Sequence, residues 1–343
     1  MDILAADIGG TESRFFRFSC NGSEIAIKEG LVLSSGYYSF ESLLGKIFSC
    51  WPEDTESLKK VSLLIFAAAG PVKEGHVDMT NASFRVEEGP ARVRFPGARC
   101  IVMNDFEAQA WACLSPAMRE AELILPGRGV PRESAGFDTA SLSGLPGSGA
   151  PVAVLGAGTG LGAAWLLPGR NKGEATRVLP SEGGHIPFPF EGEEENAFAA
   201  WLSPRLGGGP ITAEHVLSGP GLARLYEFLC GKAEAPAVFT GKPGFADSAC
   251  CGLYARFYGR FCRMAALAFL PQAVVITGGV AGKSPALVRH GEFAREFFRA
   301  GGGQGALLAE IPVWLNRHPL AGLWGAARAG AALGASDAEV RAC

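Results

Sequence analysis

The segment DIGGTESRFFRF, residues 7–18, decides how the rest of the chain is interpreted. It continues an apolar run that starts at residue 3, and it reads as the end of a strand, a tight turn and a second strand. Asn21-Gly22 follows, a dipeptide typical of hairpin turns, before another strand pattern over residues 24–33. The sequence therefore predicts a β-meander whose first turn carries two glycines and a threonine.

The same pattern returns in GAGTGLGAAWLL, residues 156–167, where a strand, a glycine-rich turn with a threonine and a strand follow each other again. Two such turns suit a phosphate chain held between two lobes, because glycine lets backbone N–H groups approach an anion closely. Each turn can equally be a simple hairpin, and neither fits a P-loop or a dinucleotide fingerprint. The candidate phosphate-binding residues are Gly9, Gly10, Thr11, Gly156, Gly158, Thr159, Gly160 and Gly162.

Between and after the two turns, periodicity predicts alternating strands and helices. The expected elements are a helix at 39–50, a strand at 61–67, a hairpin at 76–86 and a strand that ends at Met103. They are followed by helices around 222–229 and 251–270, strands at 273–279 and 311–316, and a helix at 321–334. We therefore expect a two-lobed α/β fold with an interlobe cleft, a small lobe of residues 1–109 plus 321–343, and a large lobe of residues 110–320. Residues 127–151, rich in Gly, Pro and Ser, are expected to form a flexible insertion.

Composition excludes several classes of function. The 343 residues are 48% hydrophobic and 19% charged with a net charge of -3, so nothing favours nucleic-acid binding. The most apolar long segment, residues 251–270, is interrupted by three arginines and is expected to be a core helix, not a membrane span. The opening MDILAADIGG does not resemble a signal peptide, which predicts a cytoplasmic protein. Nine scattered cysteines are expected to be free thiols, without a zinc site.

Polar side chains stand where two predicted strands end. Asp7 ends the first strand at the edge of the first glycine turn, where a carboxylate can hold hydrated Mg²⁺ beside phosphates or can simply cap the turn. Asn104 and Asp105 follow the strand that ends at Met103 and begin a helix. Either can cap that helix, so one of them is not needed for capping. If a cleft opens there, Asp105 is placed to accept a proton from an attacking hydroxyl.

Two further segments carry acids and a histidine near predicted turns. In LPSEGGHIPF, residues 179–188, Glu182 and His185 flank two glycines that permit sharp bends. Glu214 precedes the turn SGPG. Taken alone, each of these side chains can be an ordinary solvated surface group, and the residues themselves leave that alternative open.

Eight motifs in order resemble one family. They are DIGGTESR, AAAGPV with MTNASF, NDFEAQA, GAGTGLG, EGGHIPF, AEHVLSGPGL, ITGGV and IPVWLNRHPLAGLWGAA. Their order and spacing resemble bacterial ATP-dependent glucokinases of the actin/hexokinase-like ATPase superfamily, over about residues 2 to 328. The resemblance implies a ribonuclease H-like two-lobed fold, ATP and Mg²⁺, and transfer of the γ-phosphoryl group to the 6-hydroxyl of glucose.

The resemblance also assigns residue roles. It implies that Asn104 and Asp105 hold the sugar 3- and 4-hydroxyls, with Asp105 as general base, and that Asn81 also faces the sugar. Groups near the anomeric carbon would be bound by Glu182, His185 and Glu214. ATP phosphates would lie on the two glycine turns with Mg²⁺ at Asp7, and Gly278 and Gly279 would lie near the adenosine. A homodimer is usual in the family.

The sequence leaves several alternatives open. Glu12 stands where the family commonly has an amide, which adds negative charge near the phosphates and leaves the phosphoryl donor open. A sugar-responsive repressor would need an N-terminal helix-turn-helix ahead of Asp7, and a zinc-containing sugar kinase would need a cysteine cluster. The remaining alternatives are a kinase for another hexose and a catalytically silent sugar sensor of the same fold.

Overall fold

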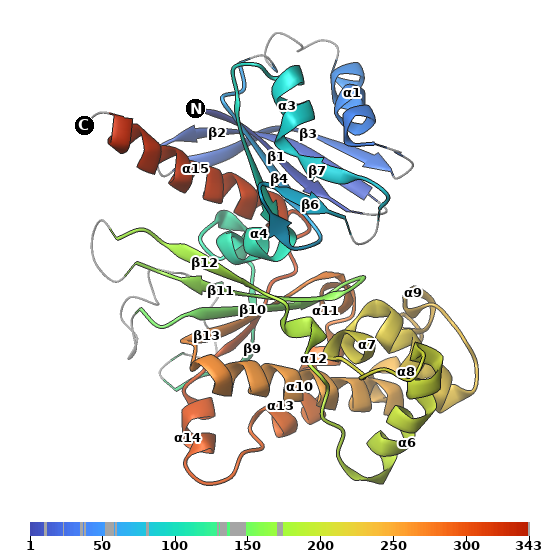
Figure 1. The fold of residues 1–343 in the computed structure, drawn as a ribbon. Coiled ribbons are helices and arrows are strands. Elements are labelled where there is room, and N and C mark those ends of the chain that lie inside the picture. The colour runs from blue at the N-terminus through green and yellow to red at the C-terminus, as the bar shows by residue number, and fades with distance from the viewer. Residues whose placement is uncertain are drawn as a thin grey trace. The chain divides into compact units, whose positions relative to one another are not determined.

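The computed structural model describes residues 1–9, 12–22, 24–34, 37, 39–51, 58, 60–79, 82–128, 130, 136–137, 149–169 and 174–341. The chain divides into two compact units, unit 1 of Met1–Met118 with Pro319–Cys343 and unit 2 of Arg119–His318 (Figure 1). The helix that begins at Asp105 packs on the C-terminal helix of the same unit. Most of the insertion at 127–151 lies outside the described residues.

Unit 1 is built on a sheet with the strand order β3-β2-β1-β4-β8. Strands β1, β2 and β3 pair antiparallel in sequence, which confirms the expected meander. Strands β4 and β8 add in parallel, and β4 is buried along its whole length, as central parallel strands usually are. The bounds are β1 Asp2–Ile8, β2 Glu12–Asn21, β3 Glu24–Ser34, β4 Leu63–Ala68 and β8 Arg99–Asn104, with a small antiparallel sheet of β5 Val72–Lys73, β6 His76–Asp78 and β7 Arg85–Glu87.

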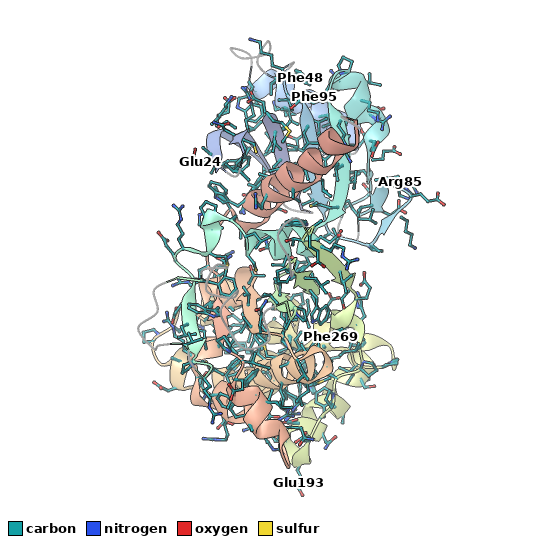
Figure 2. The ribbon with its side chains drawn as sticks, turned by 90° about the vertical axis from the view of Figure 1, so that its left-hand side faces the viewer. Glu24, Phe48, Arg85, Phe95, Glu193 and Phe269 are labelled. Atoms are coloured by element: carbon teal, nitrogen blue, oxygen red, sulfur yellow. The ribbon has the colours of Figure 1, made fainter. Side chains whose placement is uncertain are left out.

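The helices of unit 1 are α1 Phe40–Cys50, α3 Glu88–Arg94, α4 Asp105–Ala112 and α15 Ala321–Arg341, with a 3-10 turn at Pro116–Met118. Phe48, near the end of α1, packs against Phe95, the residue that follows α3, and their ring centroids lie 5.0 Å apart (Figure 2). Helices α4 and α15 approach so closely that a Cβ at Gly325 would stand 1.7 Å from the Ala108 carbonyl oxygen. A glycine on the C-terminal helix therefore sets the position of α4.

Unit 2 repeats this sheet plan. Its strand order is β12-β11-β10-β13-β14-β9, in which β10, β11 and β12 pair antiparallel and β13 and β14 add in parallel, as β1 to β4 and β8 do in unit 1. An antiparallel sixth strand, β9, completes the edge. The bounds are β9 Glu122–Leu125, β10 Val152–Ala157, β11 Leu161–Leu167, β12 Arg177–Ser181, β13 Ala273–Thr277 and β14 Val313–Leu315. The two glycine turns thus occupy the same place in two equivalent sheets.

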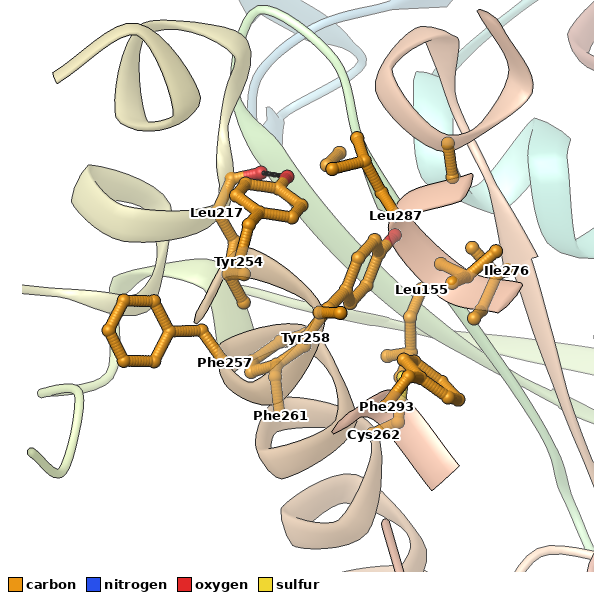
Figure 3. Close-up of a cluster of buried hydrophobic side chains, with 14 of the residues drawn as sticks. Leu155, Leu217, Tyr254, Phe257, Tyr258, Phe261, Cys262, Ile276, Leu287 and Phe293 are labelled. Atoms are coloured by element: carbon orange, nitrogen blue, oxygen red, sulfur yellow. Dashed lines mark hydrogen bonds between the residues drawn. The ribbon is translucent and has the colours of Figure 1, made fainter. Parts of the chain in front are cut away.

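The core of unit 2 forms around helix α10, Ala249–Phe269, which begins at the capping residue Ser248. Tyr254, Phe257, Tyr258 and Phe261 on this helix are buried in one hydrophobic cluster that also contains Leu155 of β10 and Ile276 of β13 (Figure 3). The Tyr254 hydroxyl donates to the Leu217 carbonyl oxygen. The other helices are α6 Gly192–Leu202, α7 Ala213–Leu217, α8 Gly219–Cys230, α9 Pro236–Phe239, α11 Gly279–Lys283, α12 Ala286–Arg289, α13 Gly291–Phe297 and α14 Gln304–Ala309. Three 3-10 turns lie at Gly183–His185, Ser203–Leu206 and Phe245–Asp247.

Helix α10 is the long apolar segment that the sequence analysis placed in a core, and it is buried there. Among the helices in the described ranges, none combines the length and apolar character that crossing a membrane requires.

Candidate active site

In unit 1 the candidate site residues gather at one edge of the sheet. Strands β1, β4 and β8 run in parallel, and their register aligns Ile8 with Ala68 and Ala68 with Asn104. The carboxyl ends of parallel strands meet at one edge, which is where ligands bind in α/β sheets. Asp7 near the end of β1 and Asn104 at the end of β8 therefore lie at the same edge of the sheet, although they are far apart in sequence.

Asn104 is the N-cap of α4. Its side-chain oxygen accepts from the backbone N–H groups of Phe106 at 2.8 Å and Glu107 at 3.4 Å, and the Glu107 carboxylate accepts from the Asn104 N–H at 3.0 Å. The Asn104 amide nitrogen donates to the Gly70 carbonyl oxygen at 2.9 Å. These contacts form a complete capping box. Asn104 is therefore the capping residue of α4, and the capping box that it forms with Glu107 does not include Asp105.

Asp105 occupies the first turn of α4 and is half-buried. One of its carboxylate oxygens, Oδ1, accepts from the Phe106 N–H at 3.0 Å. A carboxylate in the first turn of a helix interacts favourably with the helix dipole.

Asp7 keeps some accessible surface, yet the protein packed around its carboxylate raises its pKa, chiefly through desolvation. Arg14 opposes that rise and Glu12 adds to it. A Cβ at Gly322, next to the start of α15, would lie 3.5 Å from Asp7 Oδ2 and 3.2 Å from Gln109 Nε2. A hard cation beside this carboxylate would favour its ionised form, and Mg²⁺ commonly binds through one carboxylate together with substrate phosphates. The donor chemistry at Asp7 thus fits Mg²⁺.

Glu12, the departure noted in the first glycine turn, is paired with a cation. Arg14 Nε donates to Glu12 Oε1 at 2.6 Å, and Arg14 Nη2 lies 2.5 Å from the same oxygen. Arg14 Nη1 donates to the Pro319 carbonyl oxygen at 2.9 Å, at the point where the chain re-enters unit 1. The negative charge that Glu12 brings to the turn is therefore offset by a neighbouring guanidinium two residues along the strand.

In unit 2 the second glycine turn connects β10 to β11. The Gly158 N–H donates to the Gly160 carbonyl oxygen at 2.8 Å, and the Gly158 carbonyl oxygen accepts from the Gly219 N–H at 2.8 Å. Within the described part of the chain, the backbone N–H groups of Thr159 and Gly160 have no hydrogen-bond partner, and a Cβ at Gly158 would meet open space. Consecutive N–H groups in a turn can hold an anion.

Two other glycines of the predicted nucleotide site have packing reasons. A Cβ at Gly156 would stand 2.7 Å from the Thr277 carbonyl oxygen of the parallel strand β13. Gly278 has φ +90°, and a Cβ there would stand 2.5 Å from the Ala157 carbonyl oxygen. Gly278 and the adjacent Gly279, which starts α11 and has open space around it, therefore lie beside the second glycine turn at the edge where β10 and β13 end.

The loop that carries Glu182 and His185 is pressed onto this turn. A Cβ at Gly184 would stand 2.0 Å from the Leu161 carbonyl oxygen, so only glycine permits the approach. Glu182 Oε2 lies 3.4 Å from His185 Nε2, and both side chains are exposed. A short antiparallel pairing of Pro187 with Thr212 then ties this loop to the segment that leads into α7.

Glu214, in the first turn of α7, lies against the second glycine turn. Its Oε2 accepts from the Leu161 N–H at 2.9 Å, and a Cβ at Gly160 would meet that oxygen at 2.5 Å. The histidine next to it, His215, is used for capping: its Nδ1 accepts from the Thr212 N–H at 3.1 Å. In unit 2, Glu214 thus lies at the second glycine turn, and the loop that carries Glu182 and His185 lies against Leu161 at the start of β11.

Three predicted site residues, Gly10, Thr11 and Asn81, lie outside the described residues. Two residues that the structure brings to the site were not singled out from the sequence, Glu107 and Arg14. The spacing of Asn104 and Glu107 is that of a capping box and could have found the first. The pairing of Arg14 with Glu12, two positions apart on a strand, follows from their opposite charges and the shared face of residues i and i+2.

Comparison with known proteins identifies the family. The family model described as Glucokinase matches residues 4–333. A glucokinase from Pseudomonas paraeruginosa is 32% identical over 98% of this chain and 94% of its own length, and one from Helicobacter pylori is 32% identical over 94% of each. A solved glucokinase from an Antarctic psychrotroph, 25% identical, superposes with a TM-score of 0.74 over 96% of this chain and 98% of its own. The chain belongs to the glucokinase family and has the two-lobed fold of actin/hexokinase-like kinases, which confirms both expectations.

Proposed function

We propose that this chain transfers the γ-phosphoryl group of ATP to the 6-hydroxyl of glucose, with Asp105 as the general base. The observation that carries the proposal is that the capping of α4 and the proposed proton transfer are assigned to different residues. Asn104 and Glu107 form the capping box, and the adjacent carboxylate of Asp105 in the first turn is not part of it. Family membership over residues 4–333 supports the same activity.

In the proposed reaction, Asp105 accepts the proton of the sugar 6-hydroxyl as its oxygen attacks the γ-phosphorus. The bond from that phosphorus to the bridging oxygen breaks, and ADP leaves. Phosphoryl transfer needs mainly positioning and charge neutralisation from a protein. The backbone N–H groups of Thr159 and Gly160 would bind phosphate oxygens in unit 2, and the turn of Gly9, Gly10 and Thr11 would do so in unit 1.

Mg²⁺, when bound, would neutralise charge on the phosphates, and Asp7 would hold it. Sugar hydroxyls would be bound by Asn81, Asn104, Glu182, His185 and Glu214. The Asn104 side chain already makes two kinds of hydrogen bond within unit 1. Its oxygen accepts from the N-terminal N–H groups of α4, and one of its amide hydrogens is donated to the Gly70 carbonyl oxygen. Only the second amide hydrogen of Asn104 is left for a sugar hydroxyl.

A coupled assay tests the activity. Purified protein with Mg-ATP is expected to release one ADP for each glucose 6-phosphate formed, and an assay across glucose, mannose and glucosamine would rank the acceptors. Omitting the sugar measures the background hydrolysis of ATP. Sugar binding without ADP release for any hexose would favour a sensor over a kinase.

Asp7→Asn is expected to separate stability from activity. Because the folded protein raises the pKa of Asp7, its ionisation destabilises the fold progressively as pH rises through that raised pKa. The neutral isostere lacks this cost, so the melting temperature at pH 7 should be unchanged or higher. Its kcat/KM for Mg-ATP should fall about tenfold or more, the effect of losing one charge-assisted contact of at least about 1.4 kcal/mol. A melting temperature well below that of the wild type would contradict this account of Asp7.

A cytoplasmic homodimer is part of the same proposal, supported by the family resemblance. Sedimentation equilibrium of the full chain would measure the oligomeric state directly.

A further inference from the structure

We infer that Glu214 positions the second glycine turn and thereby couples sugar binding to nucleotide binding. This inference rests on the proposed function, in which Glu214 binds a sugar hydroxyl and the turn of Gly158, Thr159 and Gly160 binds ATP phosphates. In the structure, the Glu214 side chain also contacts the backbone at the end of this turn.

The contact is between a charged acceptor and a backbone donor at the end of the turn. Glu214 Oε2 accepts from the Leu161 N–H at 2.9 Å, across 53 positions of sequence. Hydrogen bonds to charged groups are stronger than those between neutral groups. The bond therefore ties the exit of the turn to helix α7.

The glycine at position 160 supports the same conclusion independently. A Cβ there would stand 2.5 Å from Glu214 Oε2, whereas a Cβ at Gly158 would meet nothing within 4 Å. The space beside Gly160 is thus taken by the Glu214 carboxylate. Gly158 leaves the open side of the turn, where a ligand can approach.

The helix that carries Glu214 is itself fixed to the sugar-side loop. The Ala213 N–H donates to the Ile186 carbonyl oxygen at 2.9 Å, and the Phe188 N–H donates to the Ile211 carbonyl oxygen at 2.9 Å. These bonds join α7 to the segment that follows Glu182 and His185. A sugar that orders this loop would therefore also order the support of the glycine turn.

The two carboxylate oxygens of Glu214 have different partners in this proposal. Oε2 holds the Leu161 N–H, which leaves Oε1 as the acceptor for a sugar hydroxyl. A sugar bound there would restrict the carboxylate to the rotamer that supports the turn, and a ligand that rigidifies a site makes the second ligand bind more tightly. Glucose is thus expected to tighten nucleotide binding.

The test uses the full chain and the probe AMPPNP with Mg²⁺, measured by titration calorimetry without sugar and then with saturating glucose. Glu214→Ala removes the acceptor, Glu214→Asp keeps the charge on a side chain too short to reach, and Glu214→Gln keeps an acceptor at full length. Glu193→Ala is the matched control, because Glu193 is an exposed acid on α6 of the same unit (Figure 2).

Without sugar, Glu214→Ala and Glu214→Asp are expected to bind AMPPNP about fivefold more weakly, and Glu214→Gln is expected to lie between these variants and the wild type, because its neutral oxygen still accepts from the Leu161 N–H but makes a weaker bond. Glu193→Ala should match the wild type. Hydrogen exchange of a peptide containing Leu161 should be faster in the same two weakened variants. Glucose should tighten AMPPNP binding in the wild type and have no such effect in Glu214→Ala.

Unchanged AMPPNP affinity and unchanged exchange at Leu161 in both Glu214→Ala and Glu214→Asp would overturn the positioning role. These sugar-free measurements do not depend on glucose turnover. A wild type that fails to phosphorylate glucose would therefore count against the proposed function. It would not change what the sugar-free measurements say about the positioning role of Glu214. If Glu214→Ala does not fold, Glu214→Asp and Glu214→Gln still decide the outcome.

Discussion

Asp105→Asn is expected to lower kcat by about 10²–10⁴, the range that general acid–base catalysis contributes. The substitution replaces one carboxylate oxygen by an amide group and removes the proton acceptor, while the remaining oxygen can still accept from the Phe106 N–H. The cap of α4 is made by Asn104 and Glu107, so the helix should form as before. The Kd for glucose should change little, because the amide still offers hydrogen bonds to the sugar.

Single-turnover kinetics and calorimetric titration with glucose separate the two effects. Asp247→Asn is a matched control, because Asp247 is an exposed acid in a 3-10 turn of unit 2, and its kcat should equal that of the wild type. An Asp105→Asn enzyme that keeps kcat within about tenfold of the wild type would remove Asp105 from the role of base. A large loss of glucose affinity with unchanged kcat would make it a binding residue instead.

The parts of the fold that sequence could predict are those with local signals. The meander of β1, β2 and β3 follows from strand periodicity and from Asn21-Gly22, and the second glycine turn predicted the repeated plan of β10 and β11. Helix α10 was predicted from its apolar run. Each of these depends on residues within about one element of each other, which is where period and turn chemistry carry information.

The rest depends on contacts between distant residues. No local pattern shows that Gly325 meets the backbone of Ala108, although this approach places α4 against α15 in unit 1. Likewise, no local pattern shows that the space beside Gly160 is filled by the side chain of Glu214. The short helices α11 to α14 and the strand β9 also have too few residues for a periodic signal.

Removing the buried guanidinium of Arg260 is expected to have the largest effect on stability. Arg260, on α10, is completely buried and lies between Glu195 of α6 and Glu296 of α13. Its Nη1 and Nη2 donate to the two Glu195 oxygens at 2.5 and 2.9 Å, and its Nε donates to Glu296 at 2.9 Å. Arg260→Met leaves two buried carboxylates without their shared cation, which costs about 3–5 kcal/mol.

The lower end of that range is expected, because Arg263 remains 3.0 Å from Glu296 and the Glu191 N–H still donates to Glu195 at 2.8 Å. Arg289→Met provides the matched control in the same unit. Arg289 makes an equally short two-point contact with Glu122, at 2.7 and 2.5 Å, but half of its side chain is exposed, so its loss should cost no more than about 1 kcal/mol. Urea unfolding of both variants compares the two costs at fixed contact geometry. Equal costs would mean that burial of the charges does not decide their contribution, because geometry alone would then set it.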